Sequence, residues 1–501
     1  MTETEIKQML AQGERLTLEC KKAKTELPKS VWESYSAFAN TIGGYILLGI
    51  DENRKETDVA KRFTIIGVDN IPKIISDLWN TINSNKVNRN ILLDSDVEKT
   101  TIDGKSIVCI HVPQADWRMK PVFLNENPYK GSFKRNHEGD YHCTEMEVRA
   151  MIRDANEDGN DGGLLDGFTL DDIDTNTLHG YRNQFRILNA DHEWNDKDDE
   201  EFLRLLGGYT KNRQTGKEGL TVAGLMMFGT GLAIRERFGN FRMDYLDMSH
   251  LEGEERYRDR LTYDGRWENN LYQFFRIVMP KLTFDLPHPF HMEGYQRVDD
   301  TPQMKAVREG FTNSIIHSDL FLDSGILRIE KHDDCLCLRN PGNLKLPIEN
   351  IYEGGVSKAR NPRIQNMLRM IGYGENIGSG FPKIISAWQK AGWGKPELID
   401  KYELQEVELR LPIPNETGGQ TSGQTGGQTG GQTGGQTGSP KTIEKVFELI
   451  KNNPYITRQE LVDKIGIKAS AIQKHIEKLK AQKRIERVGS STFGGHWDIK
   501  E

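Results

Sequence analysis

The chain has 501 residues, a formal net charge of −7 and 28% charged residues, a composition typical of soluble globular proteins. A single hydrophobic core rarely grows beyond about 300 residues, so we expect three domains. No apolar run approaches the ~18 residues that a membrane span needs, and the opening MTETEIKQML lacks a secretory signal. We therefore predict a cytoplasmic protein with no membrane partner. The five cysteines form no C-x-x-C pair, which argues against a disulfide framework and a structural zinc site.

Residues 37–52 read AFANTIGGYILLGIDE, a helix-like run, two glycines, an apolar strand and two carboxylates. The unbroken run YILLGI predicts a strand buried on both faces. Gly43 and Gly44 permit a tight, left-handed entry to that strand. Such an arrangement is common in any α/β protein, so Asp51 and Glu52 gain a functional meaning only from the residues upstream.

The upstream segment GERLTLECKKAK contains the pattern E-x-x-x-x-E-x-K. Together with AFANT-x-GG and the later run KPVFLNENPYKGSFKRNHEGDYHCTEMEVRAM, it resembles the Schlafen AlbA-type α/β domain over residues 1 to about 152. In nucleolytic members the corresponding acids hold magnesium or manganese, which activates water for attack on a phosphodiester. The resemblance places Glu14, Glu19 and either Asp51 or Glu52 at these positions, with Lys21 beside them to stabilise developing charge. Other AlbA-type members only bind nucleic acid.

Basic residues of the same segment suit either role, because both require positive charge near a phosphate backbone. The candidates for nucleic-acid binding are Lys22, Lys24, Arg118, Lys134 and Arg135, with Lys29, Lys120 and Lys130 beside them. For several of these residues a solvated surface without a ligand is the alternative interpretation.

Two breaks divide the chain. The acidic, glycine-containing stretch NEDGNDGGLLDG at 156–167 interrupts the periodic pattern and predicts a boundary. The repeat of Gly-Gly-Gln-Thr at 417–438 predicts a flexible linker that spans roughly 25 Å on average. The expected domains are 1–160, 161–416 and 439–501, with the linker before the last.

Residues 304–320, MKAVREGFTNSIIHSDL, carry the motif with the most specific chemistry. Glu309, Asn313 and His317 recur every four residues, so they lie on one face of a helix. A carboxylate and an amide one turn apart can serve a magnesium-bound triphosphate, because the carboxylate positions water and the amide oxygen binds the metal. The strand GILRIEK, the turn RNPGNL and the glycine-rich stretches GGVSKARNP and GENIGSGFPKI follow, and such glycines let backbone amides approach phosphates.

This order of boxes resembles the divergent GHKL-type ATPase domain, an α/β sandwich, of bacterial proteins described as transcriptional regulators or as helicase-related. The resemblance implies Glu309 as the catalytic acid or base and Asn313 as the magnesium ligand for ATP. The residues that we place at the cofactor are Asn313, His317, Asn340, Gly342, Gly374, Gly378 and Gly380. Where hydrolysing members carry an aspartate that recognises adenine, this chain has Asn340, which accepts the same hydrogen bond without a charge. A fold retained for dimerisation without turnover is the alternative.

The tail from residue 439 predicts three helices followed by two short strands, the order of a winged helix-turn-helix. Its third helix, in KASAIQKHIEKLKAQKRI, turns Ile472, Ile476 and Leu479 toward a core. The residues that this leaves outward for DNA are Gln473, Lys474 and Lys478. From residue 439 onward, 13 Lys and Arg against 8 Asp and Glu give a balance of +5, which suits phosphate contacts. A winged helix used for protein contacts is the alternative.

Two functions from different classes fit these segments. The first is an ATP-binding bacterial transcriptional regulator whose AlbA-type and winged domains bind DNA and whose middle domain serves as a dimerising switch in a homo-oligomer. The second is an enzyme, a metal-dependent Schlafen-like nuclease acting on DNA or RNA, gated by ATP and serving in phage defence. A possible ATPase activity is compatible with both.

Overall fold

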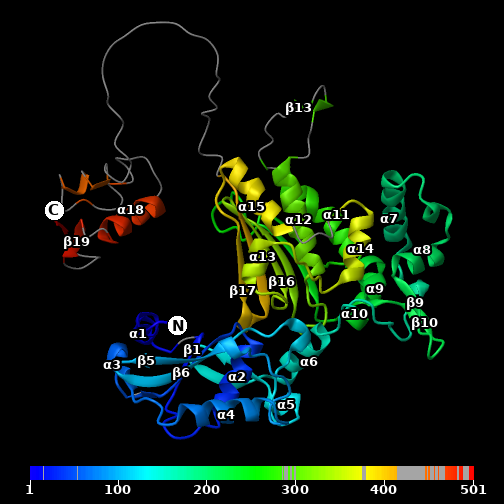
Figure 1. Ribbon diagram of the computed structural model, residues 1–501. Coiled ribbons are helices and arrows are strands. Elements are labelled where there is room, and N and C mark those ends of the chain that lie inside the picture. The colour runs from blue at the N-terminus through cyan, green and yellow to red at the C-terminus, as the bar shows by residue number, and fades with distance from the viewer. Residues whose placement is uncertain are drawn as a thin grey trace. The chain divides into compact units, whose positions relative to one another are not determined.

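A computed structural model describes residues 1–414 except 15, 54, 285, 287–291, 294–295, 298–300 and 375–379, and then 446–447, 449–451, 456, 461, 469–481, 484–488 and 496–500. The chain forms two compact units, Met1–Gly419 and Gln420–Glu501, coloured from blue to yellow and in orange to red in Figure 1. The predicted linker at 417–438 lies outside the described residues. The predicted boundary near residue 160 falls inside the first unit, where it stays a prediction.

The N-terminal part of the first unit is built on a four-stranded sheet in the order β1-β2-β6-β5. β1 and β2 are parallel and the other pairs are antiparallel. The strands are β1 (Leu18–Lys21), β2 (Gly44–Leu48), β5 (Val97–Ile102) and β6 (Lys105–Val112). One face packs against α2 (Val31–Asn40) and α4 (Ile71–Ile82), and the other packs against α1 (Glu3–Gln12). With helices on both faces, β2 is buried throughout apart from Tyr45, as its apolar sequence predicts.

The two glycines before β2 are required by close backbone approaches. Gly43 has a φ of +78°, and a Cβ there would lie 2.9 Å from Val112 O. A Cβ on Gly44 would lie 2.6 Å from the ring of Phe38. The chain can therefore turn from α2 directly into the sheet only with glycine at these positions.

Smaller elements complete this part of the chain. They are the hairpins β3 (Ile50–Glu52) with β4 (Phe63–Ile65) and β7 (Phe133–Asn136) with β8 (Gly139–His142), and the short helices α3 (Val59–Arg62), η1 (Asp94–Asp96), η2 (Trp117–Met119) and α5 (Pro128–Gly131). α6 (Glu145–Asp154) then leads toward the rest of the unit, and a capping box of Thr144 and Glu147 begins it.

A mainly helical segment follows α6. Its elements are η3 (Leu170–Asp172), α7 (Thr175–Leu188), η4 (Glu193–Asp196), α8 (Asp199–Leu206), the hairpin β9 (Tyr209–Lys211) with β10 (Glu218–Leu220), α9 (Val222–Phe228) and α10 (Gly231–Arg237). Tyr181 on α7 is fully buried, and its ring packs edge-on against Phe202, Phe228 and Tyr272. This aromatic cluster joins the helices to the next sheet in one continuous core.

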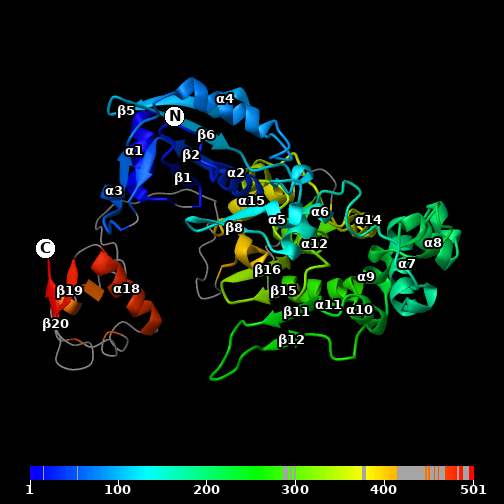
Figure 2. The same cartoon turned by 90° about the horizontal axis from the view of Figure 1, so that it is seen from below.

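The first unit also contains a six-stranded mixed sheet in the order β12-β11-β15-β16-β18-β17. Figure 2 shows β16, β15, β11 and β12 of this sheet side by side. The strands are β11 (Arg242–Asp247), β12 (Asp259–Leu261), β15 (Ile326–Lys331), β16 (Cys335–Pro341), β17 (Glu397–Lys401) and β18 (Glu406–Pro412). The helices of this part are α11 (Leu271–Thr283), α12 (Pro302–Ile316), α13 (Ile348–Glu353), α14 (Pro362–Met370) and α15 (Gly380–Ala391). The remaining elements are β13 (Met292–Glu293), β14 (Gln296–Arg297) and η5 (Tyr402–Leu404).

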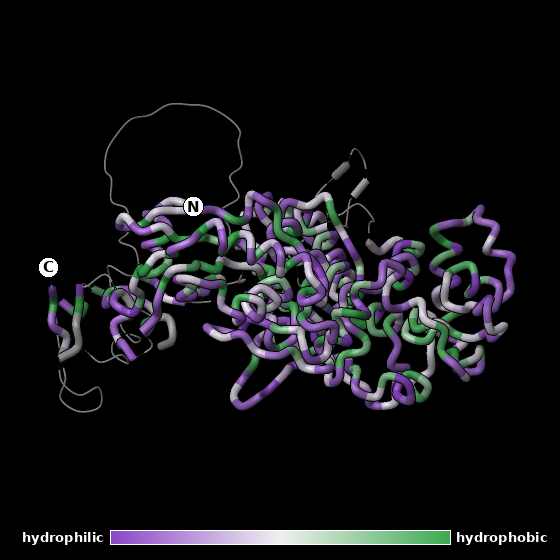
Figure 3. Tube along the Cα trace, turned by 60° about the horizontal axis from the view of Figure 1, so that its bottom comes forward, coloured by the Kyte–Doolittle hydropathy of each residue, from purple (hydrophilic) through white to green (hydrophobic). Residues whose placement is uncertain are grey.

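α12 and α15 cover one face of this sheet, where Leu338 and Leu409 from the strands pack with Phe311 and Ile384 from the helices. This α/β sandwich is the predicted fold class. Hydrophobic and hydrophilic stretches alternate along the elements of the unit in Figure 3, as expected for helices and strands buried on one side.

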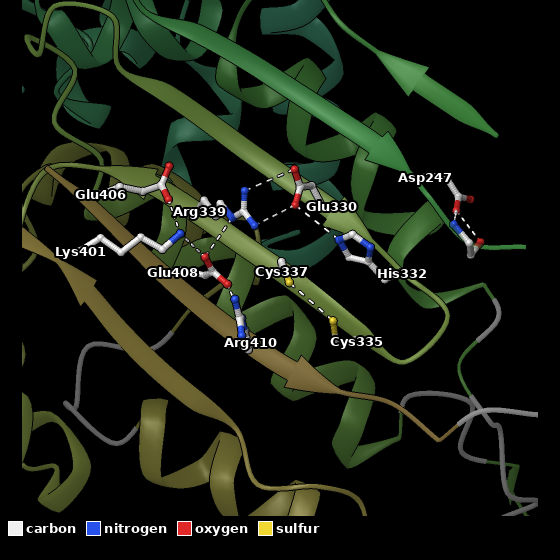
Figure 4. A network of polar contacts seen from close by, with 11 residues as sticks. Asp247, Glu330, His332, Cys335, Cys337, Arg339, Lys401, Glu406, Glu408 and Arg410 are labelled. Atoms are coloured by element: carbon white, nitrogen blue, oxygen red, sulfur yellow. Dashed lines mark hydrogen bonds and ion pairs between the residues drawn. The ribbon is translucent and has the colours of Figure 1, made fainter. Parts of the chain in front are cut away.

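The opposite face of the same sheet carries a network of charges (Figure 4). Glu408 is fully buried, and its carboxylate is paired with Arg339, Lys401 and Arg410. Arg339 also contacts Glu330 at 3.1 Å. Each buried carboxylate of this network therefore has a cation beside it, which offsets the cost of removing its charge from water.

The second unit contains α18 (Ala469–Ala481) and an antiparallel hairpin of β19 (Ile485–Val488) and β20 (His496–Ile499). Ile472, Ile476 and Leu479 of α18 are buried together with Trp497 of β20. The predicted third helix and the following two-stranded wing are confirmed. Among the described helices of both units, none combines the length and the apolar character that crossing a membrane requires.

Candidate functional site

The predicted acid and amide pair lies in the floor of a pocket in the first unit. Thr301 caps α12 and Pro302 occupies its first position, and the four-residue spacing along the helix brings Glu309, Asn313 and His317 to one cavity. Asn313 Nδ2 donates to Glu309 Oε1 at 3.3 Å. The cavity lies between α12, the end of β16 and the start of α15.

Gly380, at the start of α15, is the predicted glycine that reaches this pocket. A Cβ at this position would lie 2.3 Å from Glu309 Oε1 and 3.2 Å from Asn313 Nδ2. The absence of a side chain is therefore what allows the first turn of α15 to approach the acid and amide pair so closely.

Asn340 lines the pocket from the sheet side, near the end of β16. It is 6% exposed, and its Nδ2 is buried without a hydrogen-bond partner among the described residues. A buried amide N–H without a partner costs free energy. An acceptor atom of a ligand would satisfy it.

Three cations outside the predicted motif residues also line this pocket: Lys345, Lys358 and Arg360. Lys345 Nζ is buried and has no hydrogen-bond partner among the described residues. Burial lowers the pKa of Lys345 to about 8, while Asp154 raises it and Arg360 lowers it further. The sequence signal for these cations is the positive charge within NLKLP and GGVSKARNP.

His317 lies at the end of α12 beside these cations. Burial lowers its pKa to about 4, with Arg360 and Lys345 lowering it as well. The imidazole is therefore neutral near pH 7, and His317 adds hydrogen-bonding capacity but no positive charge to the pocket.

The other predicted glycines have different surroundings. Gly342 has a φ of +100°, and a Cβ there would lie 2.6 Å from Arg360 Nη1. Gly342 lines a neighbouring cavity that shares Lys345 and Arg360 with the first. Gly374 lies against Thr312 of α12, and Gly378 lies outside the described residues. A role of these three glycines in nucleotide binding stays a prediction.

The acidic residues of the N-terminal part are close together but already paired with cations. Glu19 on β1 contacts Lys21 through Oε1 and Arg135 through Oε2, each at 2.6 Å. Glu14 is buried and accepts a hydrogen bond from Cys20 N at 2.6 Å. Burial, then the charges of Glu19 and Glu52, raises the pKa of Glu14 to about 7.

Of the two carboxylates that end the β2–β3 run, Glu52 is the one near this group. Asp51 instead pairs with Lys22 at 2.8 Å, where both side chains are exposed. Within the described part of the chain, no three His, Cys, Asp or Glu side chains are arranged to hold a metal ion. Both oxygens of Glu19 bind protein cations, so these side chains do not fit a metal as they are placed, and a metal-binding role for them stays a prediction.

The basic candidates differ in their access to a nucleic acid. Arg135 is 1% exposed and contacts Glu19, Asp140 and Leu18 O. In this conformation its guanidinium therefore holds buried parts of the fold together and is not at the surface. Lys120 donates to Asn40 O at 2.9 Å, and burial lowers its pKa to about 8.

The remaining basic candidates lie nearer the surface. Lys22 and Lys24 are exposed. Arg118 contacts Asp116 and Glu157, whereas Lys134 is paired with Glu147. Lys22, Lys24 and Arg118, which are exposed, therefore remain better candidates for phosphate contacts than the half-buried Lys134.

On the winged domain, the structure places Lys478 at the exposed side of α18. Gln473 is half-buried and donates to Glu477 at 2.8 Å on the same helix. Lys474 belongs to α18, but its side chain lies outside the described residues. Lys480 lies over the ring of Trp497, with Nζ 5.3 Å from its centre.

Comparison with known proteins supports the three predicted resemblances. Residues 14–144 match the family model described as "Schlafen, AlbA_2", and 149–244 match a domain of unknown function. Residues 326–409 match "Putative ATP-dependent DNA helicase recG C-terminal", and 440–486 match "Winged helix-turn-helix DNA-binding". No curated protein matches the chain significantly.

Two solved structures are similar to the chain. The DIP2311 protein from Corynebacterium diphtheriae is 15% identical over 99% of this chain and 98% of its own, with a TM-score of 0.39. The N-terminal domain of a putative ATP-dependent DNA helicase RecG-related protein from Nitrosomonas europaea is 25% identical over 29% of this chain and 94% of its own, with a TM-score of 0.22.

Proposed function

From a chain that joins a Schlafen AlbA_2 segment, a RecG C-terminal-like segment and a winged helix-turn-helix, we propose a nucleotide-binding bacterial transcriptional regulator that binds DNA. The observation that carries the proposal is the pocket, which Glu309 and Asn313 of α12 line together with Asn340 and Lys345. Asn340 Nδ2 and Lys345 Nζ are buried there without hydrogen-bond partners among the described residues. Such a site combines a carboxylate, a cation and polar side chains, as a magnesium-bound purine nucleotide requires.

Each of these groups has a defined task in this proposal. The amide oxygen of Asn313 and the carboxylate of Glu309 would hold a magnesium ion and its water, since hard cations prefer oxygen ligands. The amide of Asn340 would bind the edge of the base, because it offers one donor group and one acceptor. The Glu19–Arg135 ion pair in the N-terminal part favours this regulator over the alternative of a metal-dependent nuclease.

Removing the amide of Asn313 tests the nucleotide site. We expect Asn313→Ala to weaken magnesium-dependent ATP binding by at least about tenfold, because one metal ligand and its charge-assisted contacts are lost. Titration calorimetry of the full chain, with and without magnesium, measures this effect. Asn350→Ala truncates an exposed asparagine on α13 and should bind as the wild type does. Equal affinity in the Asn313 and Asn350 variants would contradict the assignment.

Charge on α18 tests the DNA-binding part of the proposal. We expect Lys474→Ala combined with Lys478→Ala to weaken binding of the full chain to duplex DNA and to reduce the slope of log K against log[salt] by about two, because two phosphate contacts are lost. Fluorescence anisotropy at several salt concentrations provides both values. Lys390→Ala, at an exposed position in the first unit, is the charge control. An unchanged slope would assign the winged domain to protein contacts.

A further inference from the structure

The ring of Trp117, in the N-terminal part of the first unit, packs against two lysines that line the proposed nucleotide pocket. It begins η2 and is 8% exposed. Lys345 Nζ lies 4.2 Å from the centre of its ring, and Lys358 Nζ lies 5.0 Å from it. Both lysines come from the segment between β16 and α14, more than 200 residues further along the chain. Trp117 itself lines the neighbouring cavity, so the AlbA_2 segment contacts the pocket through Lys345 and Lys358.

The two lysines differ in what satisfies their charge. Lys358 Nζ donates to Glu157 O at 3.0 Å. Lys345 Nζ is buried and has no hydrogen-bond partner among the described residues. A ring face attracts an ammonium group, but it leaves the remaining N–H donors of the lysine without acceptors. Lys345 is thus held in place with unused donors at the edge of the pocket.

The two carboxylates whose charges raise the pKa of Lys345, Asp154 and Asp319, are already paired with arginines. Asp154 forms a two-point contact with Arg360, through Nε at 3.0 Å and Nη2 at 2.9 Å. Asp319 is paired with Arg153. Because buried cations require an anionic or strongly polar partner, the unused capacity of Lys345 indicates an anionic group from a ligand.

We propose that Lys345 binds the phosphates of the nucleotide and that Trp117 positions it, so that the AlbA_2 segment forms part of the nucleotide site. The proposal rests on the function proposed above and assigns the phosphate end of that site. Phosphate binding and the contact between the two parts of the first unit are then linked, and each strengthens the other by the same factor. Trp117 is a positioning residue here, because it acts through Lys345.

A double-mutant cycle on the full chain tests this assignment, with Lys345→Met, Trp117→Leu and their combination, and with ATP, adenosine and inorganic tripolyphosphate as ligands in magnesium. We expect Lys345→Met to weaken ATP and tripolyphosphate by ~10- to 100-fold, the range for a lost charged hydrogen bond, and to leave adenosine unchanged. Trp117→Leu should weaken ATP by a few-fold, and it should add no further loss once Lys345 is methionine. Lys390→Met, an exposed lysine on α15, controls for net charge, and melting temperatures control for folding.

The outcomes separate this inference from the proposed function. If Lys345→Met binds ATP as tightly as the wild type, or loses adenosine and ATP equally, the assignment of Lys345 is overturned. Strictly additive losses from Lys345→Met and Trp117→Leu would overturn the positioning role of Trp117. A wild type that binds tripolyphosphate but not adenosine would overturn the base site and support the phosphate site. A wild type that binds neither ATP nor tripolyphosphate would overturn both.

Discussion

Replacing Arg135 by methionine is expected to lower the free energy of unfolding of the first unit by about 3–5 kcal/mol, the usual cost of leaving a buried charge without its partner. The guanidinium contacts Glu19 at 2.6 Å, Asp140 at 2.9 Å and Leu18 O at 2.8 Å. Methionine fills much of the same space but satisfies none of these oxygens. Glu19, which is 4% exposed, would lose the guanidinium and keep its contact with Lys21.

Urea unfolding followed by circular dichroism measures this loss, and two further variants give it meaning. Arg149→Met removes an exposed arginine of α6 that pairs with Glu145 one turn away, and its cost should stay near the ~0.3–0.5 kcal/mol of helix surface pairs. Adding Glu19→Gln to Arg135→Met removes the orphaned charge and should restore part of the stability. A loss in Arg135→Met no larger than in Arg149→Met would show that the buried cluster does not stabilise the fold.

Local sequence patterns predicted the elements that their own residues determine. The run YILLGI became β2 and the start of β3, because continuous apolar residues suit a strand between two layers of helices. The helical face of Glu309 and Asn313 followed in the same way from their four-residue spacing.

Contacts over long sequence distances explain what could not be predicted. Arg360 and Asp154 are 206 residues apart in sequence, and nothing in SKARNP indicates that its arginine pairs with a carboxylate of α6. Glu19 matched a metal-ligand motif, yet Arg135, 116 residues away, occupies one of its oxygens. In both cases a charge was visible in the sequence, whereas its partner depended on how the layers pack. Lys345 was missed for the same reason, since its lack of a hydrogen-bond partner is a property of the folded pocket.

Arg360→Met is expected to have a second large effect, a loss of about 3–5 kcal/mol together with loss of nucleotide binding. Arg360 is 3% exposed, and it joins Asp154 of α6 to the carbonyl oxygens of His317 and Asn343. Without the guanidinium, the carboxylate of Asp154, whose side chain is only 16% exposed, loses its arginine partner, and the two carbonyl groups beside the pocket lose a common donor. The α6 junction should therefore loosen at the same time as the pocket.

Limited trypsin digestion tests the junction, and calorimetry with ATP tests the pocket. Faster cleavage near Arg153 is expected in Arg360→Met, because local opening exposes backbone to the protease. Arg369→Met, which removes an exposed arginine of α14 that bonds Asn366, should digest and bind ATP as the wild type does. Combining Arg360→Met with Asp154→Asn should recover stability but not ATP binding, since the buried charge is removed while the pocket still lacks its guanidinium. Recovery of both properties would show that Arg360 serves only to neutralise Asp154 and has no part in shaping the pocket.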